Sequence, residues 1–410
     1  MTFRPDITEQ LARARADLRM GVPIVLLGPQ PILVFAAETL TAQRLADLLA
    51  LGGDPVLVIT ARRAETLKAR AYDGDLARVI LPDDPTPRWV QSVADPADDL
   101  RSPMKGPLNC ARGGDATPHR AALSLVKSAR LLPAALVLDL IDAISFAEKH
   151  GLTTLDLATA LPVLATRSPL NPIVNARLPI EVSDAGRLHI FRPDDGGEEH
   201  YAIEIGRPDR SKPVLTRLHS ACFTGDILGS LKCDCGPQLR AALAQMGTEG
   251  HGILLYLNQE GRGIGLANKM RAYSLQDQGF DTVEANHRLG FEDDERDFRL
   301  GSDILKSMGF SSVRLLTNNP RKVEMMAASG IEVAERVPLK VGENRHNHAY
   351  LATKAAKSAG RSGSIAQGAS VSRKDLPLHH WEIGYHTAQE RRRRCDPRRH
   401  PPRRRDAIPA

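Results

Sequence analysis

The sequence is poor in aromatic residues and cysteines, and it lacks long hydrophobic runs. Only 4% of its 410 residues are Phe, Trp or Tyr, so aliphatic and alanine side chains must fill its cores. No apolar run approaches the roughly 18 residues that a membrane-spanning helix needs, and the N-terminus has no apolar segment of the signal-peptide type. These absences predict a cytoplasmic protein with no membrane contact. In that reducing compartment, clustered thiols bind metal more often than they form disulfides.

The net charge of +6 belongs to one end of the chain. From Arg361 onward the sequence has twelve Lys and Arg against five Asp and Glu, which leaves the first 360 residues close to neutral. This end contains arginine runs mixed with Pro and His and has no hydrophobic periodicity, so it is predicted to be a disordered basic tail. The main part of the chain therefore gives no electrostatic reason to expect nucleic-acid binding, and only the tail offers a possible contact.

The remaining sequence predicts a mixed α/β or α+β protein with two domains. In the first, buried strands are expected around the turn that begins at Gly28, and Thr41 is a candidate N-cap for the next helix. The second opens with strands and continues with a helix, a strand and a glycine-rich turn. The predicted parts are residues 1–165, a proline-containing linker at 166–179, a catalytic domain at 180–360 and the tail at 361–410.

Three of the five cysteines lie within fourteen residues, at Cys222, Cys233 and Cys235. Three thiolates could hold Zn²⁺ and leave a coordination position open for an activated water, the arrangement typical of catalytic zinc. Cys233 and Cys235 stand at the predicted start of a helix, whose dipole favours thiolates. Two other interpretations stay open: a structural zinc site closed by a fourth ligand such as His219, or three unrelated buried cysteines.

Two segments further along the chain could bind phosphate. Glu260, Gly261 and Arg262 belong to a glycine-rich loop between a predicted strand and a helix, although the loop matches neither a Walker A motif nor a dinucleotide fingerprint. In Thr317–Lys322, Asn319 is a candidate cap, and Lys322 in the first helical turn would be favoured by a bound anion. Each segment alone is also compatible with an ordinary turn or cap.

Taken together, the motifs resemble the GTP cyclohydrolase II family of riboflavin biosynthesis. The resemblance rests on HSACFTGDILGSLKCDCG, NQEGRGIGLANKMRAYSLQDQG, DTVEANHRLGF, DDERDF and LLTNNPRKVE, in this order, within about residues 175–360. It implies that a zinc-activated water attacks C8 of GTP. The products would be formate, pyrophosphate and 2,5-diamino-6-ribosylamino-4(3H)-pyrimidinone 5′-phosphate. One zinc ion per subunit, Mg²⁺ with the GTP phosphates and a homodimer are further implications.

The resemblance also assigns site residues. Arg296 matches a nucleophile towards the α-phosphate, Asp294 its proton acceptor, and Tyr273 a tyrosine linked to ring opening. Ala221 departs from the family pattern, in which glutamate is common before the first cysteine. The matching metal ligands are Cys222, Cys233 and Cys235, and the matching GTP contacts are Arg217, Leu218, His219, Ser220, Ala221, Gln238, Glu260, Gly261, Arg262, Thr282, Thr317 and Lys322.

The N-terminal domain resembles 3,4-dihydroxy-2-butanone 4-phosphate synthase more distantly. The similar segments are AAETLT, ARGG and SARLLPAALVLDL with FAEKHGLTTLDL. An acidic metal-binding loop of that family is replaced by Gly28–Pro31, and its His-Thr-Glu triplet by Asp115–Thr117. Without carboxylates and histidine for an Mg²⁺-dependent enolisation, this domain is expected to be catalytically inactive and to serve folding, dimer contacts or regulation.

Two alternatives to riboflavin synthesis remain at this stage. One is a paralogous cyclohydrolase of pyrimidine catabolism, or one that opens the ring without releasing pyrophosphate; the Asp294 and Arg296 pair argues against the latter. The other is a non-catalytic zinc protein that binds nucleotide or RNA through its basic tail. It would leave the complete set of catalytic residues unexplained.

Overall fold

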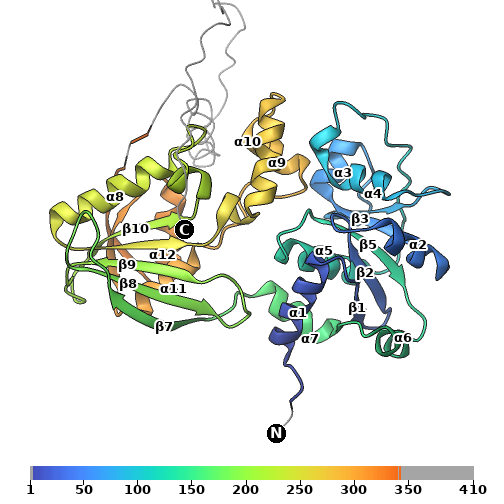
Figure 1. Ribbon diagram of the computed structural model, residues 1–410, viewed down its shortest axis with the longest axis horizontal. Coiled ribbons are helices and arrows are strands. Elements are labelled where there is room, and N and C mark those ends of the chain that lie inside the picture. The colour runs from blue at the N-terminus through green and yellow to red at the C-terminus, as the bar shows by residue number, and fades with distance from the viewer. Residues whose placement is uncertain (1–2, 340, 343–410) are drawn as a thin grey trace, which may run out of the picture. The chain divides into compact units, whose positions relative to one another are not determined.

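The computed structural model describes residues 3–339, 341 and 342 (Figure 1). The predicted tail, 361–410, lies outside the described residues, as does the end of the predicted catalytic domain. Within the described part of the chain, no helix is both long and apolar enough to cross a membrane. Two separate sheets carry the fold, in agreement with the predicted mixed α/β class and two domains.

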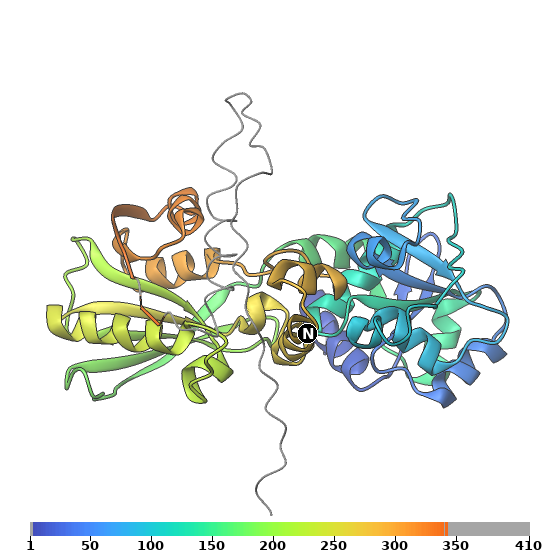
Figure 2. The same ribbon diagram turned by 90° about the horizontal axis from the view of Figure 1, so that it is seen from above.

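The first sheet has six strands in the order β4-β3-β5-β2-β1-β6. Strands β1 and β2 are the two strands predicted around the turn at Gly28, and they pair antiparallel with Leu26 opposite Ile32. Helices cover both faces (Figures 1 and 2), and each face buries its own apolar cluster. The strands are β1 (Ile24–Leu27), β2 (Ile32–Ala36), β3 (Val56–Thr60), β4 (Leu76–Ile80), β5 (Ala134–Asp139) and β6 (Thr154–Asp156).

The helices of this domain begin where the sequence offers caps. Thr41 caps α2 by accepting a hydrogen bond from the backbone N–H of Arg44, as predicted. Thr86 caps α4 in the same way, by accepting a hydrogen bond from the backbone N–H of Trp89. The helices are α1 (Ile7–Arg19), α2 (Ala42–Ala50), α3 (Ala61–Leu67), α4 (Pro87–Ala94), the short 3-10 turn η1 (Pro96–Asp98), α5 (Thr117–Ser128), α6 (Ala143–His150) and α7 (Leu157–Ala165).

The second sheet has seven strands in the order β13-β12-β10-β11-β9-β8-β7. Its strands β10 to β13 are parallel neighbours, while β7 to β9 form an antiparallel extension. One face packs on α8 (Cys235–Glu249), and the other on α11 (Arg299–Ser307) and α12 (Pro320–Ala328). The strands are β7 (Leu170–Arg177), β8 (Gly186–Pro193), β9 (His200–Ile205), β10 (Val214–Ser220), β11 (Gly252–Leu257), β12 (Ser312–Leu316) and β13 (Glu332–Val337).

Strand β7 corrects the sequence-based boundary. Its residues fall inside the predicted linker, 166–179, yet they pair with β8 along the whole strand. Pro172 is accommodated because β7 is the edge strand, where a missing backbone N–H interrupts no ladder, and the register shifts just after it. The prolines that suggest a linker therefore mark a sheet edge.

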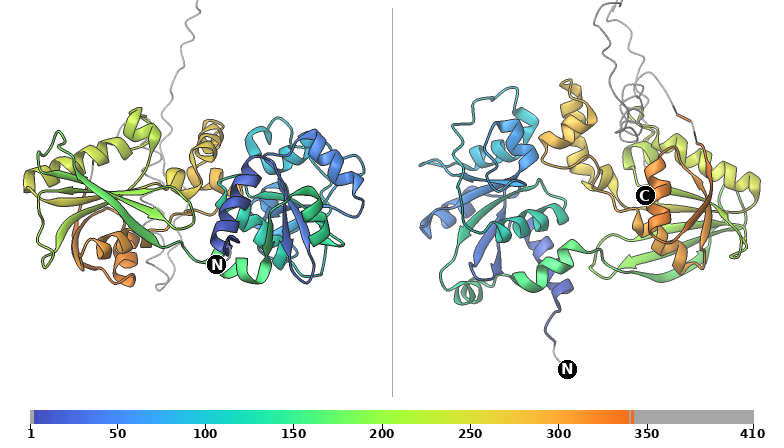
Figure 3. Two further views of the ribbon diagram at one scale, coloured as in Figure 1. Left: turned by 60° about the horizontal axis from the view of Figure 1, so that its bottom comes forward. Right: turned by 180° about the vertical axis from the view of Figure 1, so that it is seen from behind.

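The first two α-helices after β11, α9 (Leu266–Asp277) and α10 (Thr282–Arg288), pack against the N-terminal domain (Figure 3). Ala272, Leu275 and Phe291 belong to the same buried cluster as Leu57 and Ile59 of β3. The two domains thus share one hydrophobic core across this boundary. The helical elements of the second domain are the π-turn η2 (Phe223–Ile227), α8 (Cys235–Glu249), the 3-10 turn η3 (Glu260–Gly263), α9 (Leu266–Asp277), α10 (Thr282–Arg288), α11 (Arg299–Ser307) and α12 (Pro320–Ala328).

Candidate active site

The candidate site lies beyond the carboxyl ends of three parallel strands. Strand β10 ends at Ser220, just before Cys222; β11 leads into the glycine-rich loop; and β12 ends just before Thr317. Because parallel neighbouring strands end at one edge of the sheet, three segments far apart in the sequence meet there. This is the position in open α/β sheets where ligands commonly bind.

The three cysteines form one cluster. The Sγ atoms of Cys222, Cys233 and Cys235 all lie within 4.8 Å of one another, and those of Cys222 and Cys233 are 3.7 Å apart. Two thiolates on one tetrahedral Zn²⁺, at about 2.3 Å each, would be about 3.8 Å apart, so the spacing fits zinc. In the described part of the chain, no fourth His, Cys, Asp or Glu joins the cluster at that spacing.

Gly225 makes room for the cluster. A Cβ at this position would stand 2.7 Å from the Sγ of Cys233 and 3.0 Å from that of Cys222. The η2 turn thus passes directly over the thiols, and any side chain here would push into the space that a metal would need. This close packing indicates that the turn and the thiols form a single site.

Lys269 provides the positive charge next to the thiols. Its Nζ lies 3.1 Å from the Sγ of Cys222 and 2.9 Å from both the hydroxyl of Thr224 and the carboxylate of Glu260. Hydrogen bonds from the neighbouring thiols and from Lys269 lower the pKa of Cys222, which favours a thiolate. Burial works against the charge of Lys269, but its bonds to Glu260 and Cys222 raise its pKa above the ordinary value.

Sequence reasoning missed Lys269, although a signal was available. It precedes Tyr273 by four residues, so the two side chains share one face of α9. Tyr273 lies beside the same cluster, with the Lys269 Nζ 5.6 Å from its ring centre. Burial raises the pKa of the Tyr273 hydroxyl, which therefore keeps its proton at neutral pH.

His219 has a partner other than the thiols. Its Nε2 lies 3.0 Å from an Oδ of Asp226, which also accepts hydrogen bonds from the Tyr256 hydroxyl and the Cys222 backbone N–H, each at 3.0 Å. His219 also stacks on the Tyr256 ring. Asp226, which sequence reasoning also missed, thus fixes the backbone at Cys222, and the imidazole of His219 holds Asp226 in place. His219 is not part of the thiol cluster.

Arg296 and Asp294 form a directed pair. The guanidinium Nε and Nη2 donate to the two carboxylate oxygens of Asp294 at 2.8 and 2.6 Å, and Nη1 reaches the hydroxyl of Ser220 at 3.4 Å. Burial raises the pKa of Asp294, but the bonds from Arg296 outweigh it and lower the pKa overall. Asp294 is therefore ionised at neutral pH and orients the guanidinium towards the end of β10.

A second cation lies near Arg296. Lys322 donates to the Leu218 carbonyl at 3.0 Å, and its Nζ lies 4.5 Å from the centre of the Phe298 ring, over which Arg296 also lies. Asn319 caps α12 and Pro320 begins it, as predicted. The two cations and the amino end of this helix provide positive potential for phosphate groups.

Arg217 and Gln238 are buried beneath this edge. One Nη of Arg217 donates to the side chain of Gln238 and the other to the Leu316 carbonyl. Burial lowers the pKa of Arg217 to about 10, so it stays charged at neutral pH. Its Nε and the Oε1 of Gln259 are buried without a hydrogen-bond partner, and such atoms are expected where a ligand completes the network.

The remaining predicted residues lie on these same segments. Glu260, Gly261 and Arg262 form the turn after β11, where Glu260 accepts a hydrogen bond from the Phe223 N–H at 2.6 Å. Thr317 follows β12. Thr282 begins α10 and accepts a hydrogen bond from Gln276 of α9, within the helix pair. The structure therefore brings the predicted residues to the sheet edge, apart from Thr282.

Known proteins match both parts of the chain. Residues 171–338 match the sequence model of the family described as GTP cyclohydrolase II. A GTP cyclohydrolase-2 of Azospirillum brasilense is 45% identical over 359 residues, covering 84% of this chain and 92% of that protein. The enzyme of the same name from Azotobacter vinelandii is 56% identical over 181 residues, covering 44% of this chain and 87% of its own length.

One solved structure is titled as RibBX, a two-domain 3,4-dihydroxy-2-butanone 4-phosphate synthase from A. baumannii. It is 17% identical, covers 81% of this chain and 99% of its own, and has a TM-score of 0.30, at which the likeness carries no argument. The relationship thus rests on the family match and on the A. brasilense protein, which aligns with both domains. The chain belongs to the GTP cyclohydrolase II family.

Proposed function

We propose that this protein hydrolyses GTP to 2,5-diamino-6-ribosylamino-4(3H)-pyrimidinone 5′-phosphate, formate and pyrophosphate, as the first step of riboflavin biosynthesis. One observation carries the proposal: a three-thiol cluster and the Asp294–Arg296 pair lie at the same edge of a parallel sheet, in a chain of this family. Hydrolysis of the base needs the first feature, and phosphate chemistry the second.

Cys222, Cys233 and Cys235 would hold Zn²⁺, which when bound lowers the pKa of a water ligand and so supplies a nucleophile at neutral pH. Three thiolates and one Zn²⁺ leave a net negative charge, which Lys269 offsets from 3.1 Å. Glu260, bonded to Lys269 and to the N–H of Phe223, fixes the turn over the thiols and can accept a proton. Tyr273, which keeps its proton, can donate a hydrogen bond during ring opening.

The phosphate end of GTP is assigned to the cations on the other side of the edge. Arg296 would attack the α-phosphate, and Asp294, ionised and in contact with its Nε and Nη2, would take the proton. Lys322 would pair with phosphate oxygens. Mg²⁺ would accompany the phosphates of GTP as part of the substrate.

Further GTP contacts follow from the same arrangement. The buried Arg217–Gln238 pair and the unpaired side-chain Oε1 of Gln259 offer donors and acceptors at the base of the site. We also assign the protein to the cytoplasm as a homodimer, on family resemblance. The proposed contacts are Arg217, Leu218, His219, Ser220, Ala221, Gln238, Glu260, Gly261, Arg262, Thr317 and Lys322, with Thr282, which lies away from the sheet edge, assigned on family resemblance alone.

The test is a product assay. Purified protein loaded with zinc is incubated with GTP and Mg²⁺, and formate, pyrophosphate and the pyrimidine are quantified. Formate and pyrophosphate are expected in equal amounts. Folded, zinc-loaded protein that releases neither would overturn the proposal, and formate without pyrophosphate would indicate a cyclohydrolase of different chemistry. Rescue of a riboflavin auxotroph tests the pathway.

A further inference from the structure

The loop that carries Asp294 and Arg296 is held from outside its own domain. It runs from Leu289 to Phe298, between α10 and α11, and its buried Phe291 belongs to a core shared with β3. The charged side chains of this loop point in two directions, towards the candidate site and towards the N-terminal domain. Asp294 and Arg296 bond to each other and reach Ser220, whereas Glu292 and Glu295 bond to residues of the N-terminal domain.

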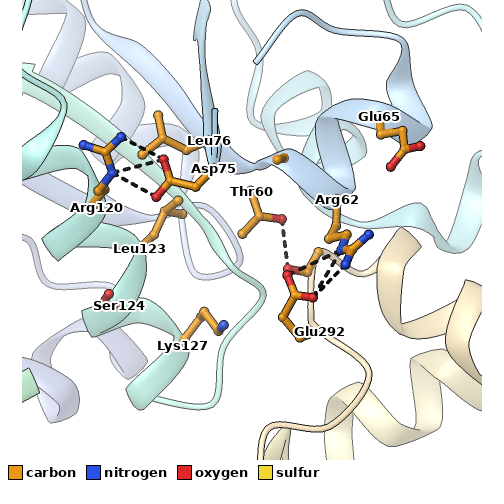
Figure 4. Close-up of a pocket in the computed structure, with 12 residues that line it drawn as sticks. Thr60, Arg62, Glu65, Asp75, Leu76, Arg120, Leu123, Ser124, Lys127 and Glu292 are labelled. Carbon is orange, nitrogen blue, oxygen red and sulfur yellow. Dashed lines mark hydrogen bonds and ion pairs between the residues drawn. The ribbon is translucent and has the colours of Figure 1, made fainter. Parts of the chain in front are cut away.

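Three contacts make this attachment, and Figure 4 shows two of them, those of Thr60 and of Arg62. The hydroxyl of Thr60 donates to the Gly290 carbonyl at 2.8 Å, Arg62 donates through two nitrogens to Glu292, and the Nζ of Lys127 lies 2.8 Å from Glu295. Each contact has at least one member in the lining of a cavity of about 490 Å³ at the domain boundary. The loop is therefore held by the buried Phe291 and, where it borders the cavity, by these polar contacts.

The opposite side of the loop is attached to the glycine-rich turn. The N–H of Glu295 donates to the Arg262 carbonyl at 3.0 Å. Arg262 adopts a left-handed backbone with φ of 61°, and a Cβ on the following Gly263 would lie 2.8 Å from the Glu295 carbonyl oxygen. Such a conformation is unfavourable for a residue with a side chain and persists only where the surroundings fix it.

Glu295 is the residue at which the two attachments meet. Its backbone bonds to the turn beside the thiols, its carboxylate accepts from Lys127 and from the Glu292 N–H, and its neighbours in sequence are Asp294 and Arg296. A shift of Glu295 must therefore move the Arg296 guanidinium relative to Ser220. Reacting groups are sensitive to such shifts, because misplacement by about 1 Å can cost a hundredfold in rate.

We infer that Lys127 of the N-terminal domain is a positioning residue for the Asp294–Arg296 pair, acting through Glu295. The inference rests on the proposed function and extends it: the N-terminal domain contributes to the phosphate step of the neighbouring domain. Lys127 does not touch the reacting groups, and the Lys127–Glu295 pair is about a quarter exposed, so the expected effect is moderate.

The test compares Lys127→Met with a matched interdomain control. Arg15 pairs with Asp195 at 2.9 Å and so also joins the two domains, but away from this loop. Lys127→Met is expected to lower kcat for pyrophosphate release by about three- to tenfold, with zinc content and KM for GTP within twofold of wild type. Arg15→Met should leave kcat unchanged, and Lys127→Arg should restore most of it.

A double-mutant cycle shows whether Lys127 acts through Glu295. The double variant, Lys127→Met with Glu295→Gln, should be no slower than the slower single variant, because both changes disrupt the same Lys127–Glu295 ion pair. Wild-type kcat in Lys127→Met, equal losses in Arg15→Met, or fully multiplying losses in the double variant would each overturn the inference. Absence of products from the wild-type protein would overturn the proposed function instead, so the two failures are distinguishable.

Discussion

One buried arginine from each domain shows two different uses of a buried polar side chain. In the N-terminal domain, Arg63 is almost fully buried and satisfied, with Asp99, the Val93 carbonyl and the Ser92 carbonyl as acceptors. In the second domain, buried thiols crowd together and Arg217 keeps an unpaired Nε. Fully paired polar groups stabilise a fold, whereas crowded or incompletely paired ones are costly and mark places where a ligand is expected.

A polar cavity survives in the N-terminal domain as well. It measures about 130 Å³, and Gln30, Asp139, Arg78 and His119 are among its lining residues. Gln30 donates to Asp139 at 3.0 Å, and Arg78 is held by two bonds to Asp73. Most of these polar groups are turned towards one another, although the Nδ1 of His119 is buried without a hydrogen-bond partner. The contrast with the thiol site is therefore one of residue type more than of bonding.

The sharpest way to test this contrast is to remove a cysteine from each domain. Cys233→Ser is expected to abolish zinc binding and to reduce formate release to less than about one thousandth, because the metal and the nucleophile it supplies are lost together. Zinc content is measured by mass spectrometry alongside activity. Cys110→Ser, in the N-terminal domain, is the control; equal zinc loss in both variants would break the comparison.

The second prediction concerns the crowding above the thiols. Gly225→Ala would place a methyl group 2.7 Å from the Cys233 Sγ, so zinc affinity should fall by roughly 10- to 100-fold while the fold persists. Competition with a chelator measures the affinity. Gly197→Ala, at an exposed glycine, should bind zinc as wild type does. Unchanged affinity in Gly225→Ala would show that the turn can move away from the metal.

The third prediction uses pH. Burial lowers the pKa of His200 to about 4, against about 6.5 in an unfolded chain, and its Nδ1 accepts the Asn258 N–H. Below pH 6.5 the unfolded chain binds a proton that the folded one does not, so stability falls between pH 6.5 and 4, by at most about 3 kcal/mol. Urea unfolding should show a shallower pH dependence for His200→Gln. Parallel curves would contradict this assignment.

The smallest effect is expected in the N-terminal cavity. Asp139→Asn keeps the shape of the side chain and should change GTP hydrolysis by less than about twofold, because this cavity supplies no group to that reaction. Wild-type protein should also form no 3,4-dihydroxy-2-butanone 4-phosphate from pentose phosphates. Detection of that product, abolished by Asp139→Asn, would reverse the contrast between the domains.

Local signals in the sequence were sufficient to predict where several helices begin and that the three cysteines cluster. Thr41 and Asn319 cap the helices that their positions predict, and the clustered cysteines do converge. Sequence could not identify β7 as a strand, because proline signals a linker unless the strand is known to lie at an edge. Nor could it reveal Lys127, whose role depends on a partner 168 residues away.

Helix α9 has two faces with different partners. Lys269 and Tyr273 face the thiols, while Asn268, Ala272 and Leu275, at helical spacing, face the N-terminal domain, where Asn268 donates to the Arg130 carbonyl. Excision of residues 3–165 would expose this apolar stripe to water and favour aggregation of the remainder. The apolar face of α9 therefore makes the second domain dependent on the first for its solubility.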